Sequence, residues 1–557
     1  MYDFVTILLR RNEKMSFSKK ILAVFLCAVM LLPVCAVGAS ASGRCACGND
    51  PIVYVVGKQP LYVFNEDGTK TEQLVKSDLD IGGIAKKVLP ILGSALKTGD
   101  WTEYCDALYD ILAPVYDNVR LDGNGKPVNA NTGIDWSWSP ATVPSAHSYH
   151  FGNAFYYQFD WRLSPLDVAD DLNDYIECVK QKTGHDKIVL VSRCMGTNYA
   201  MAYLYKYERP RNYSGITASA WLNGAMNGMD WTEALYSGTV VLEPDSAYRF
   251  VEVLGLTDSI EDAALAEVLN LTVNSLKETY GFDAACKIIE KKLYPNIKDR
   301  LIARLIKHFY GTTGGSLSMI NDKFEESINT VYPTDADKAE YAAVIAKATE
   351  YHDNVTVHAG DILKEAEASG APVGIFAEYG GQQYPLSASA PYCGDSSLTL
   401  TDQSFGAVSS KVDGKLDEKY IEERVNAGFE KYISPDKQVD ASTCLFPETT
   451  WFFKNAHHTY PEAIHYVMLW FLRGEKPTVS ADASYPQFMN YDASITDLPT
   501  WKQLSPLQEK NTSDIDWSKY NPTGSTASLL LKIIYKMREI VLYIVNLIRD
   551  IVHSAAG

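Results

Sequence analysis

The sequence predicts an α/β protein with a mostly parallel central sheet. Short, continuous apolar runs recur along the chain and alternate with amphipathic stretches of helical period. This alternation is typical of parallel strands joined by right-handed helical crossovers. The chain has 557 residues, of which 46% are hydrophobic and 22% charged, so it holds enough apolar material for a large buried core.

Charge and composition exclude several classes of protein. The formal net charge is −18 and no long run of Lys or Arg occurs, which argues against nucleic-acid binding. The ten cysteines form no zinc-type pairs, so neither a small disulfide scaffold nor a zinc-finger array is predicted. The sequence shows no convincing metal-ligand spacing and no Gly-rich phosphate loop, so we expect no metal and no other cofactor.

The first segment in chain order is a predicted signal peptide, residues 1–41. Lys19 and Lys20 precede an apolar run at 21–37, and small residues follow at 38–41. This order is typical of secretory signals, so we expect a secreted or extracytoplasmic protein, with association at the cell surface also compatible. A membrane anchor is the alternative, although the run is near the lower length limit for a span. In an oxidising compartment most of the remaining cysteines would be able to pair.

Residues 42–228 carry the first part of the predicted core. Pro165 opens a strongly amphipathic helix, and Gly184 ends it. The predicted strands are 51–56, 156–161, 187–191 and 216–222, and the predicted helices are 165–182 and 196–207.

Residues 229–370 change character and are mostly helical, which we interpret as a cap inserted between strands of the sheet. Residues 371–475 return to the core. Residues 476–527 are rich in Pro, Ser, Asp and Thr and show no period, so we expect an irregular linker or wrap. The predicted elements of the second core part are strands at 373–378 and 450–454 and a helix at 461–472.

Residues 528–557 form a predicted amphipathic helix at the C-terminus. Polar residues recur at alternating spacings of four and three, which makes one narrow polar stripe on an apolar cylinder. Such a helix has to bury most of its surface. The alternatives are docking on the protein body, self-association through residues 528–553, or binding at a membrane surface.

A nucleophile motif lies between the strand at 187–191 and the helix that follows. Ser192, Cys194 and Gly196 match the pattern small-x-nucleophile-x-small, which a sharp strand-to-helix turn requires because the backbones approach closely. The start of a helix behind Cys194 would stabilise a thiolate. We therefore predict Cys194 as a nucleophile, and the alternative is a buried structural cysteine.

Attack on a carbonyl carbon would need donors for the developing oxyanion. The backbone N–H of Met195, directly after the nucleophile, is the first candidate. A second donor is expected from the loop after the first strand, near Lys58 or Gln59.

Several segments around this turn resemble the α/β-hydrolase superfamily, and more closely the lecithin:cholesterol acyltransferase-like lipases. The similarity is strongest over residues 156–207 and looser over 51–60 and 370–472. The resemblance implies a mostly parallel sheet with helices on both faces and an inserted cap. The segments that carry it are Phe159-Asp160-Trp161-Arg162-Leu163-Ser164-Pro165, Asp170-Asp171-Leu172, Thr183-Gly184-His185-Asp186-Lys187 and the turn at 192–196.

The same resemblance implies a triad in the chain order nucleophile, acid, base. Asp395 follows a late strand, and its spacing to the segment 404–406 resembles the family's acid segment; Asp402 is the second choice. For the base, the family pattern favours His458, and His457 is the second choice. This chain departs from the family in having Cys194 where the nucleophilic serine is usual.

We expect from these residues a hydrolase or acyltransferase acting on ester, thioester or lactone groups, with a lipid-like substrate favoured. A thiolate leaves a tetrahedral adduct readily, which biases such an enzyme toward activated acyl groups. The alternative is a non-catalytic binding or scaffold protein with a structural Cys194. A His nitrogen within about 4 Å of the Cys194 sulfur would favour the enzyme, and a disulfide at Cys194 would exclude it.

Overall fold

The fold is described from a computed structural model of the chain. The predicted signal peptide, the predicted C-terminal helix and His457 lie outside the described residues. The described residues are 45, 47–74, 81–147, 153–239, 241, 281, 284, 287–383, 387–412, 414–456, 458, 461–474, 477–495 and 500–508.

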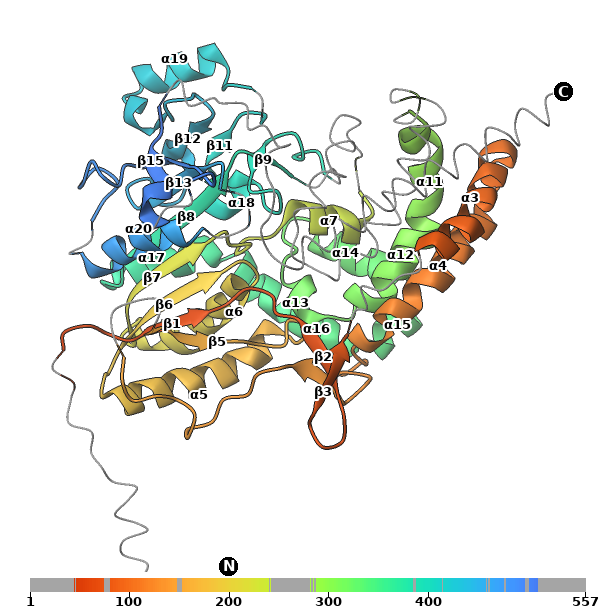
Figure 1. Ribbon diagram of the computed structural model, residues 1–557, viewed down its shortest axis with the longest axis horizontal. Coiled ribbons are helices and arrows are strands. Elements are labelled where there is room, and N and C mark those ends of the chain that lie inside the picture. The colour runs from red at the N-terminus through yellow and green to blue at the C-terminus, as the bar shows by residue number, and fades with distance from the viewer. Residues whose placement is uncertain are drawn as a thin grey trace, which may run out of the picture.

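An eight-stranded sheet forms the centre of the molecule, in the order β15-β14-β13-β8-β7-β6-β1-β5 (Figure 1). Every neighbouring pair is parallel except β14 and β15, which are antiparallel. The predicted α/β class with a mostly parallel sheet is therefore confirmed. The strands are β1 (Ile52–Val55), β5 (Phe155–Tyr157), β6 (Ile188–Arg193), β7 (Ile216–Leu222), β8 (Val373–Tyr379), β13 (Thr450–Lys454), β14 (Phe488–Tyr491) and β15 (Leu504–Pro506).

Alternate residues of the buried strands face two separate cores, because successive side chains of a strand point to opposite faces. Val53 and Val55 belong to the core beneath α5 (Pro165–Thr183), α6 (Gly196–Tyr203) and α17 (Ala359–Ala368). Ile52 and Tyr54 belong to the core beneath α20 (Glu462–Arg473). Helices thus cover both faces of the sheet, which is why its strands are continuous apolar runs.

The described part of the segment 476–527, which was expected to be irregular, contains regular structure. This segment contributes β14 and β15 to the sheet, and Phe488 and Met489 are buried. The strands have four and three residues, so no period is visible in the sequence. Their backbone groups are satisfied by pairing with β13, a tertiary contact that local composition does not show.

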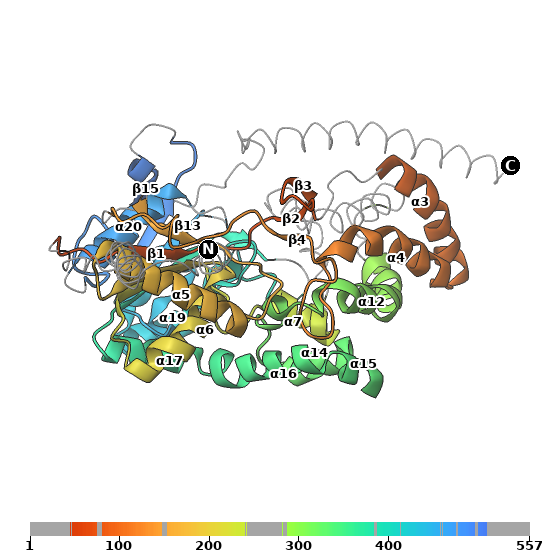
Figure 2. The ribbon, with the colours of Figure 1, turned by 90° about the horizontal axis from the view of Figure 1, so that it is seen from below.

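A helical lobe lies at one end of the sheet in both views (Figures 1 and 2). Two separate parts of the chain build it, and α4 (Thr102–Tyr116) packs against α12 (Ala303–Leu305). The Arg304 guanidinium pairs with the Asp106 carboxylate at 2.6 Å across this contact. The part that includes α3 (Ile81–Thr98) and α4 belongs to this lobe, although residues 42–228 were expected to belong to the core.

The predicted end of the cap at residue 370 also differs from the structure. Helix α17 covers the sheet, and its Ile362 and Leu363 share a core with Val373 of β8. The other described α-helices of this region are α7 (Asp230–Ser237), α11 (Tyr294–Ile297), α13 (Gly314–Leu317), α14 (Phe324–Val331), α15 (Asp335–Glu340) and α16 (Ala342–Tyr351).

Three small antiparallel sheets are present besides the central sheet in the described residues. Strands β2 (Leu61–Phe64), β3 (Lys70–Gln73) and β4 (Thr132–Ile134) form one, in the order β3-β2-β4. Two further pairs are β9 (Gly381–Gln382) with β10 (Cys393–Gly394), and β11 (Val408–Ser409) with β12 (Val439–Asp440). The remaining α-helices among the described residues are α18 (Leu400–Ser404) and α19 (Glu418–Asn426).

The cysteines of the described residues are free thiols, so the pairing permitted by an oxidising compartment is not seen among them. They are Cys45, Cys47, Cys105, Cys178, Cys194, Cys393 and Cys444.

Within the part of the chain that the structure describes, none of the helices combines the length and the apolar character needed to cross a membrane.

Candidate active site

The candidate site lies where the winding of the sheet changes direction. The chain passes from β1 outward to β5 and then returns to place β6 on the other side of β1. In open α/β sheets, ligands bind at the carboxyl ends of the strands next to such a switch point. Gly57, just after β1, and Cys194, just after β6, meet there: a Cβ built on Gly57 would lie 3.2 Å from the Cβ of Cys194.

The turn at Cys194 is as sharp as the sequence motif predicts. Cys194 has a φ of 51°, in the left-handed region that non-glycine residues rarely adopt, and α6 begins two residues later at Gly196. A Cβ on Gly196 would lie 2.2 Å from the carbonyl oxygen of Val56. Only glycine fits at position 196, because the helix start is pressed against the end of β1.

His458 and Asp395 complete a hydrogen-bonded chain with the thiol. Nε2 of His458 lies 3.2 Å from Sγ of Cys194, and Nδ1 of His458 lies 2.6 Å from Oδ2 of Asp395. Asp395 is fully buried, whereas the side chain of His458 is 21% exposed. The three side chains come from separate parts of the sequence in the order that was predicted.

Backbone contacts hold the histidine and the acid in place. His458 follows β13, and its N–H donates to the carbonyl oxygen of Asp395 at 2.8 Å. Oδ1 of Asp395 accepts from the N–H groups of Ser397 at 2.8 Å and Leu398 at 2.7 Å. The carboxylate therefore keeps one oxygen for the loop and presents the other to the imidazole.

The electrostatics of the site favour a thiolate–imidazolium pair. Burial alone would raise the pKa of Cys194, but His458, Arg193 and the N–H of Met195 outweigh it and lower that pKa to about 7. Burial opposes protonation of His458, yet the Asp395 carboxylate and the Cys194 thiolate raise the pKa of His458 well above its usual value. Opposite charges at hydrogen-bond distance favour the charged form of each partner.

Of the predicted oxyanion donors, the N–H of Met195 contacts the Cys194 thiol. Met195 directly follows Cys194 at the start of α6. The side chain of Gln59 turns back onto its own loop, donating to the carbonyl oxygen of Gly57 at 3.1 Å. The ammonium group of Lys58 lies 4.2 Å from the centroid of the Trp161 ring. Both side chains thus have partners within the loop or beside it.

Sequence reasoning missed a second buried carboxyl group at the site. Glu378 lies at the end of β8 and is fully buried, and the amide of Asn223 donates to it at 2.6 Å. Burial and the Asp395 carboxylate raise the pKa of Glu378 to about 8, although His458 and Asn223 oppose the shift. A charged residue within a fully apolar strand was the one signal in the sequence that marked it.

The second-choice acid does not join the triad. Asp402 is half-buried in α18, where its backbone N–H donates to the hydroxyl of Thr399. Burial and the neighbouring Asp230 carboxylate raise the pKa of Asp402 to about 7. The acid that contacts His458 is Asp395, while His457, the second-choice base, lies outside the described residues.

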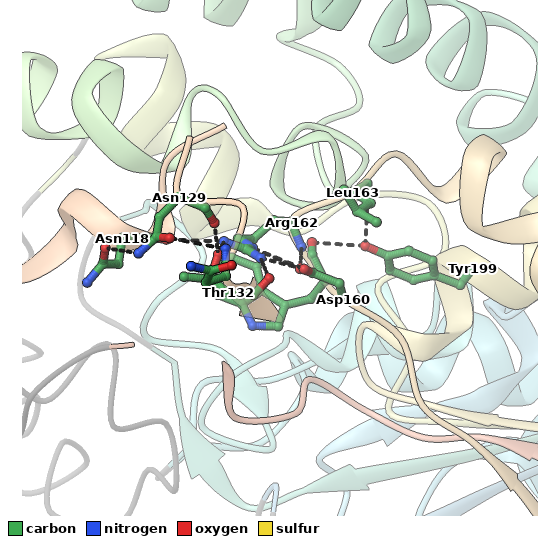
Figure 3. Close-up of polar contacts among 9 residues, drawn as sticks. Asn118, Asn129, Thr132, Asp160, Arg162, Leu163 and Tyr199 are labelled. Atoms are coloured by element: carbon green, nitrogen blue, oxygen red, sulfur yellow. Dashed lines mark hydrogen bonds and ion pairs between the residues drawn. The ribbon is translucent and has the colours of Figure 1, made fainter. Parts of the chain in front are cut away.

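The Asp-Trp-Arg segment has a structural role next to the site. The fully buried Arg162 guanidinium donates to the Asp160 carboxylate at 2.6 Å (Figure 3). It also donates to the carbonyl oxygen of Asn118 at 3.1 Å and the hydroxyl of Thr132 at 3.0 Å. Tyr199 of α6 donates to the carbonyl oxygens that flank Arg162. This network ties the first part of the helical lobe to the helix that carries the nucleophile turn.

Fold and site together define an α/β protein with a cysteine-centred Cys-His-Asp chain at the switch point of its sheet. No model of a protein family matches the chain, and no curated protein matches it. Among solved structures, a chain of the Tle4–Tli4 complex is 13% identical, with 59% of this chain and 75% of that chain covered and a TM-score of 0.19. The structure titled DBJA is 13% identical, with 62% and 78% covered and a TM-score of 0.16.

Proposed function

We propose that this protein is a cysteine-dependent α/β-hydrolase that cleaves or transfers acyl groups. The observation that carries the proposal is the chain of contacts from Cys194 Sγ through the His458 imidazole to the Asp395 carboxylate. It lies at the carboxyl ends of the strands, next to a switch point, on a strained turn before a helix. The strand order and the inserted helices are compatible with the α/β-hydrolase fold that the sequence resembles.

In the proposed reaction the Cys194 thiolate attacks the acyl carbonyl carbon and forms a tetrahedral adduct. The N–H of Met195 donates to the oxyanion, with a second donor from the loop after β1. The His458 imidazolium gives its proton to the departing oxygen or sulfur, which leaves an acyl thioester on Cys194. Water or an alcohol then attacks this thioester and passes a proton to His458, which restores the thiolate–imidazolium pair.

The substrate class follows from the nucleophile. A thiolate with a pKa of about 7 attacks readily but also leaves the adduct readily. The chemistry therefore favours thioesters, lactones and activated esters over ordinary alkyl esters. We propose that the acyl group is lipid-like and that the protein is secreted or extracytoplasmic.

The test is turnover of short-chain acyl thioesters, phenyl esters and lactones by the wild-type protein and the Cys194→Ala and Cys194→Ser variants. Wild-type protein should turn over at least one thioester or activated ester, and Cys194→Ala should lose about 10³-fold or more. Cys178→Ala, the same change at a buried thiol of α5, is the matched control. Equal rates for wild type and Cys194→Ala, or no acyl adduct on the Cys194 peptide by mass spectrometry, would contradict the proposal.

A further inference from the structure

A cluster of side chains of the kind that bind metals lies at the opposite end of the parallel strands from the candidate active site. The sulfur atoms of Cys45 and Cys47 and a ring nitrogen of His185 all lie within 4.8 Å of one another. Nε2 of His147 lies 3.6 Å from the Cys47 sulfur, and the rings of His147 and His185 meet edge to face with centroids 4.6 Å apart. These three ligands, with the His147 imidazole beside Cys47, come from three separate segments of the chain.

Two sulfur–nitrogen distances at Cys47 match those of a bound zinc ion. With a zinc–sulfur bond of about 2.3 Å and a zinc–nitrogen bond of about 2.0–2.1 Å, a tetrahedral site separates sulfur from nitrogen by about 3.6 Å. The Cys47 sulfur lies 3.5 Å from Nε2 of His185 and 3.6 Å from Nε2 of His147. Nε2 of His147 also donates to the carbonyl oxygen of Asn49 at 2.9 Å, a contact that it would exchange for the ion.

The surroundings of His185 have the form usual for a metal ligand. Its Nδ1 lies 2.9 Å from the carboxylate of Asp50, which directs Nε2 toward the thiols. The other oxygen of Asp50 accepts from the hydroxyl of Thr217. A carboxylate behind the histidine fixes its tautomer and orientation in zinc sites.

We propose that Cys45, Cys47 and His185 bind one Zn²⁺, that His147 moves from its place beside Cys47 to become the fourth ligand of a closed tetrahedral site, and that Asp50 positions His185. Binding takes up two thiolates and two neutral imidazoles and releases the thiol protons to solvent. All four tetrahedral positions are taken by protein, which is typical of structural rather than catalytic zinc.

The location agrees with a structural role. His185 precedes β6 and Cys194 follows it, so the six residues of the strand place the two sites roughly 20 Å apart. Residues 47–50 lead into β1 (Figure 1), and the N–H of Cys45 donates to the carbonyl oxygen of Gly184 at 2.9 Å. The ion would fasten this segment to the loop between α5 and β6.

The test measures zinc bound by the full chain in a Cys194→Ala background, which removes the thiol of the candidate active site. Reduced protein is loaded with Zn²⁺, passed over a weak chelator and analysed for metal content. About one zinc per chain is expected for the parent, and Cys45→Ser with Cys47→Ser, or His185→Ala alone, should abolish retention. Cys178→Ser, at a thiol outside the cluster, should bind like the parent.

Two further variants separate the ligand set from its support. His147→Ala should weaken zinc binding at least tenfold, and Asp50→Asn should weaken it by about 10- to 100-fold. Co²⁺ in place of zinc should give the thiolate charge-transfer and tetrahedral d–d absorption bands, and the Cys45 and Cys47 changes should abolish both. Circular dichroism checks that each variant is folded.

The proposal fails if reduced parent protein retains no zinc, or if retention is the same in the Cys45, Cys47 and His185 variants. If the protein is isolated with a Cys45–Cys47 disulfide and binds no zinc once that disulfide has been reduced, the proposal is overturned as well. Unchanged affinity in folded His147→Ala would overturn the assignment of the fourth ligand.

Discussion

The sulfur of Cys194 lies 3.2 Å from Nε2 of His458, although 264 positions separate the two residues in the chain. The contact exists because β6 and β13 run in the same direction in one sheet, so the loops that follow them meet at one edge. Asp395 approaches the far side of the imidazole from a third loop.

Alkylation of Cys194 by iodoacetamide should rise with pH through an inflection near 7 and then level off. The pKa of this thiol is lowered to about 7, and the thiolate that reacts is the form present above it. In His458→Ala the inflection should move up, to about 8.5 or higher, because the cation is lost and burial remains. Mass spectrometry of the Cys194 peptide measures the rate. An inflection near 8.5 in wild type would contradict the ion pair, and Cys444, whose burial raises its pKa to about 11, should stay unreactive.

Asp395→Asn should lower kcat by about 100-fold or more, because the imidazolium loses its counter-ion and the correct histidine tautomer is no longer enforced. The asparagine oxygen still accepts from the loop N–H groups that hold Asp395, so the fold should survive. Initial rates on the best thioester measure the effect. Asp402→Asn, at the half-buried carboxyl group that was the second-choice acid, should stay within about twofold of wild type. The reverse ranking of the two variants would reassign the acid.

Gly196→Ala should destabilise the protein by about 1–3 kcal/mol, because the added methyl group overlaps the end of β1. Its Cβ would lie 2.2 Å from the carbonyl oxygen of Val56. Urea unfolding followed by circular dichroism measures the loss. Gly93→Ala in α3 is the control, since nothing lies within 4 Å of its Cβ, and it should stabilise the protein by about 0.5–1 kcal/mol. Equal effects of the two changes would mean that the close approach at Gly196 is not real.

Arg162→Met should cost about 3–5 kcal/mol, because it leaves the Asp160 carboxylate and other buried acceptors without their partner. Thermal and urea unfolding measure the change. Lys347→Met is a control at an ion pair whose side chains are 42% and 49% exposed, and it should cost less than about 1 kcal/mol. A loss below 1 kcal/mol at Arg162 would show that this network does not hold the helical lobe to the core.

Glu378→Gln should stabilise the protein increasingly as the pH rises from about 4.5 to about 8. The pKa of Glu378 is raised to about 8, so over this range the folded state keeps a proton that the unfolded chain releases, and wild-type stability falls. Glutamine mimics the protonated acid and still offers an oxygen to Asn223, so the variant lacks this slope. The free energies of unfolding of both proteins, measured at pH 5 and pH 8, give the comparison. A difference between them that does not grow with pH would contradict the shifted pKa.

Much of the fold was predictable from local pattern. The strand at Ile216–Leu222 and the strand at Thr450–Lys454 have the bounds expected from their apolar runs. Helix α5 begins at Pro165, as the proline indicates. The nucleophile turn was recognisable because its small flanking residues meet a steric demand that acts within a few positions of Cys194.

The features that the sequence did not predict have one physical cause in common. Strands β14 and β15 are stabilised by pairing with a distant strand, and α4 joins the helical lobe through contacts with a later part of the chain. The four candidate zinc ligands come from three segments, so no spacing in the sequence marks them. Pattern reasoning detects what neighbours along the chain dictate, and these features depend on neighbours in space.

The sequence by itself determined the α/β class, the main strands, the cysteine on its strained turn and the short list of partners for it. Those properties follow from residue size, polarity and period over a few positions. Only the tertiary structure decided that Asp395 rather than Asp402 contacts His458, and that Glu378 lies buried beside them. The reason is that hydrogen bonds and pKa values depend on ångström distances between loops, and the packing of the sheet sets those distances.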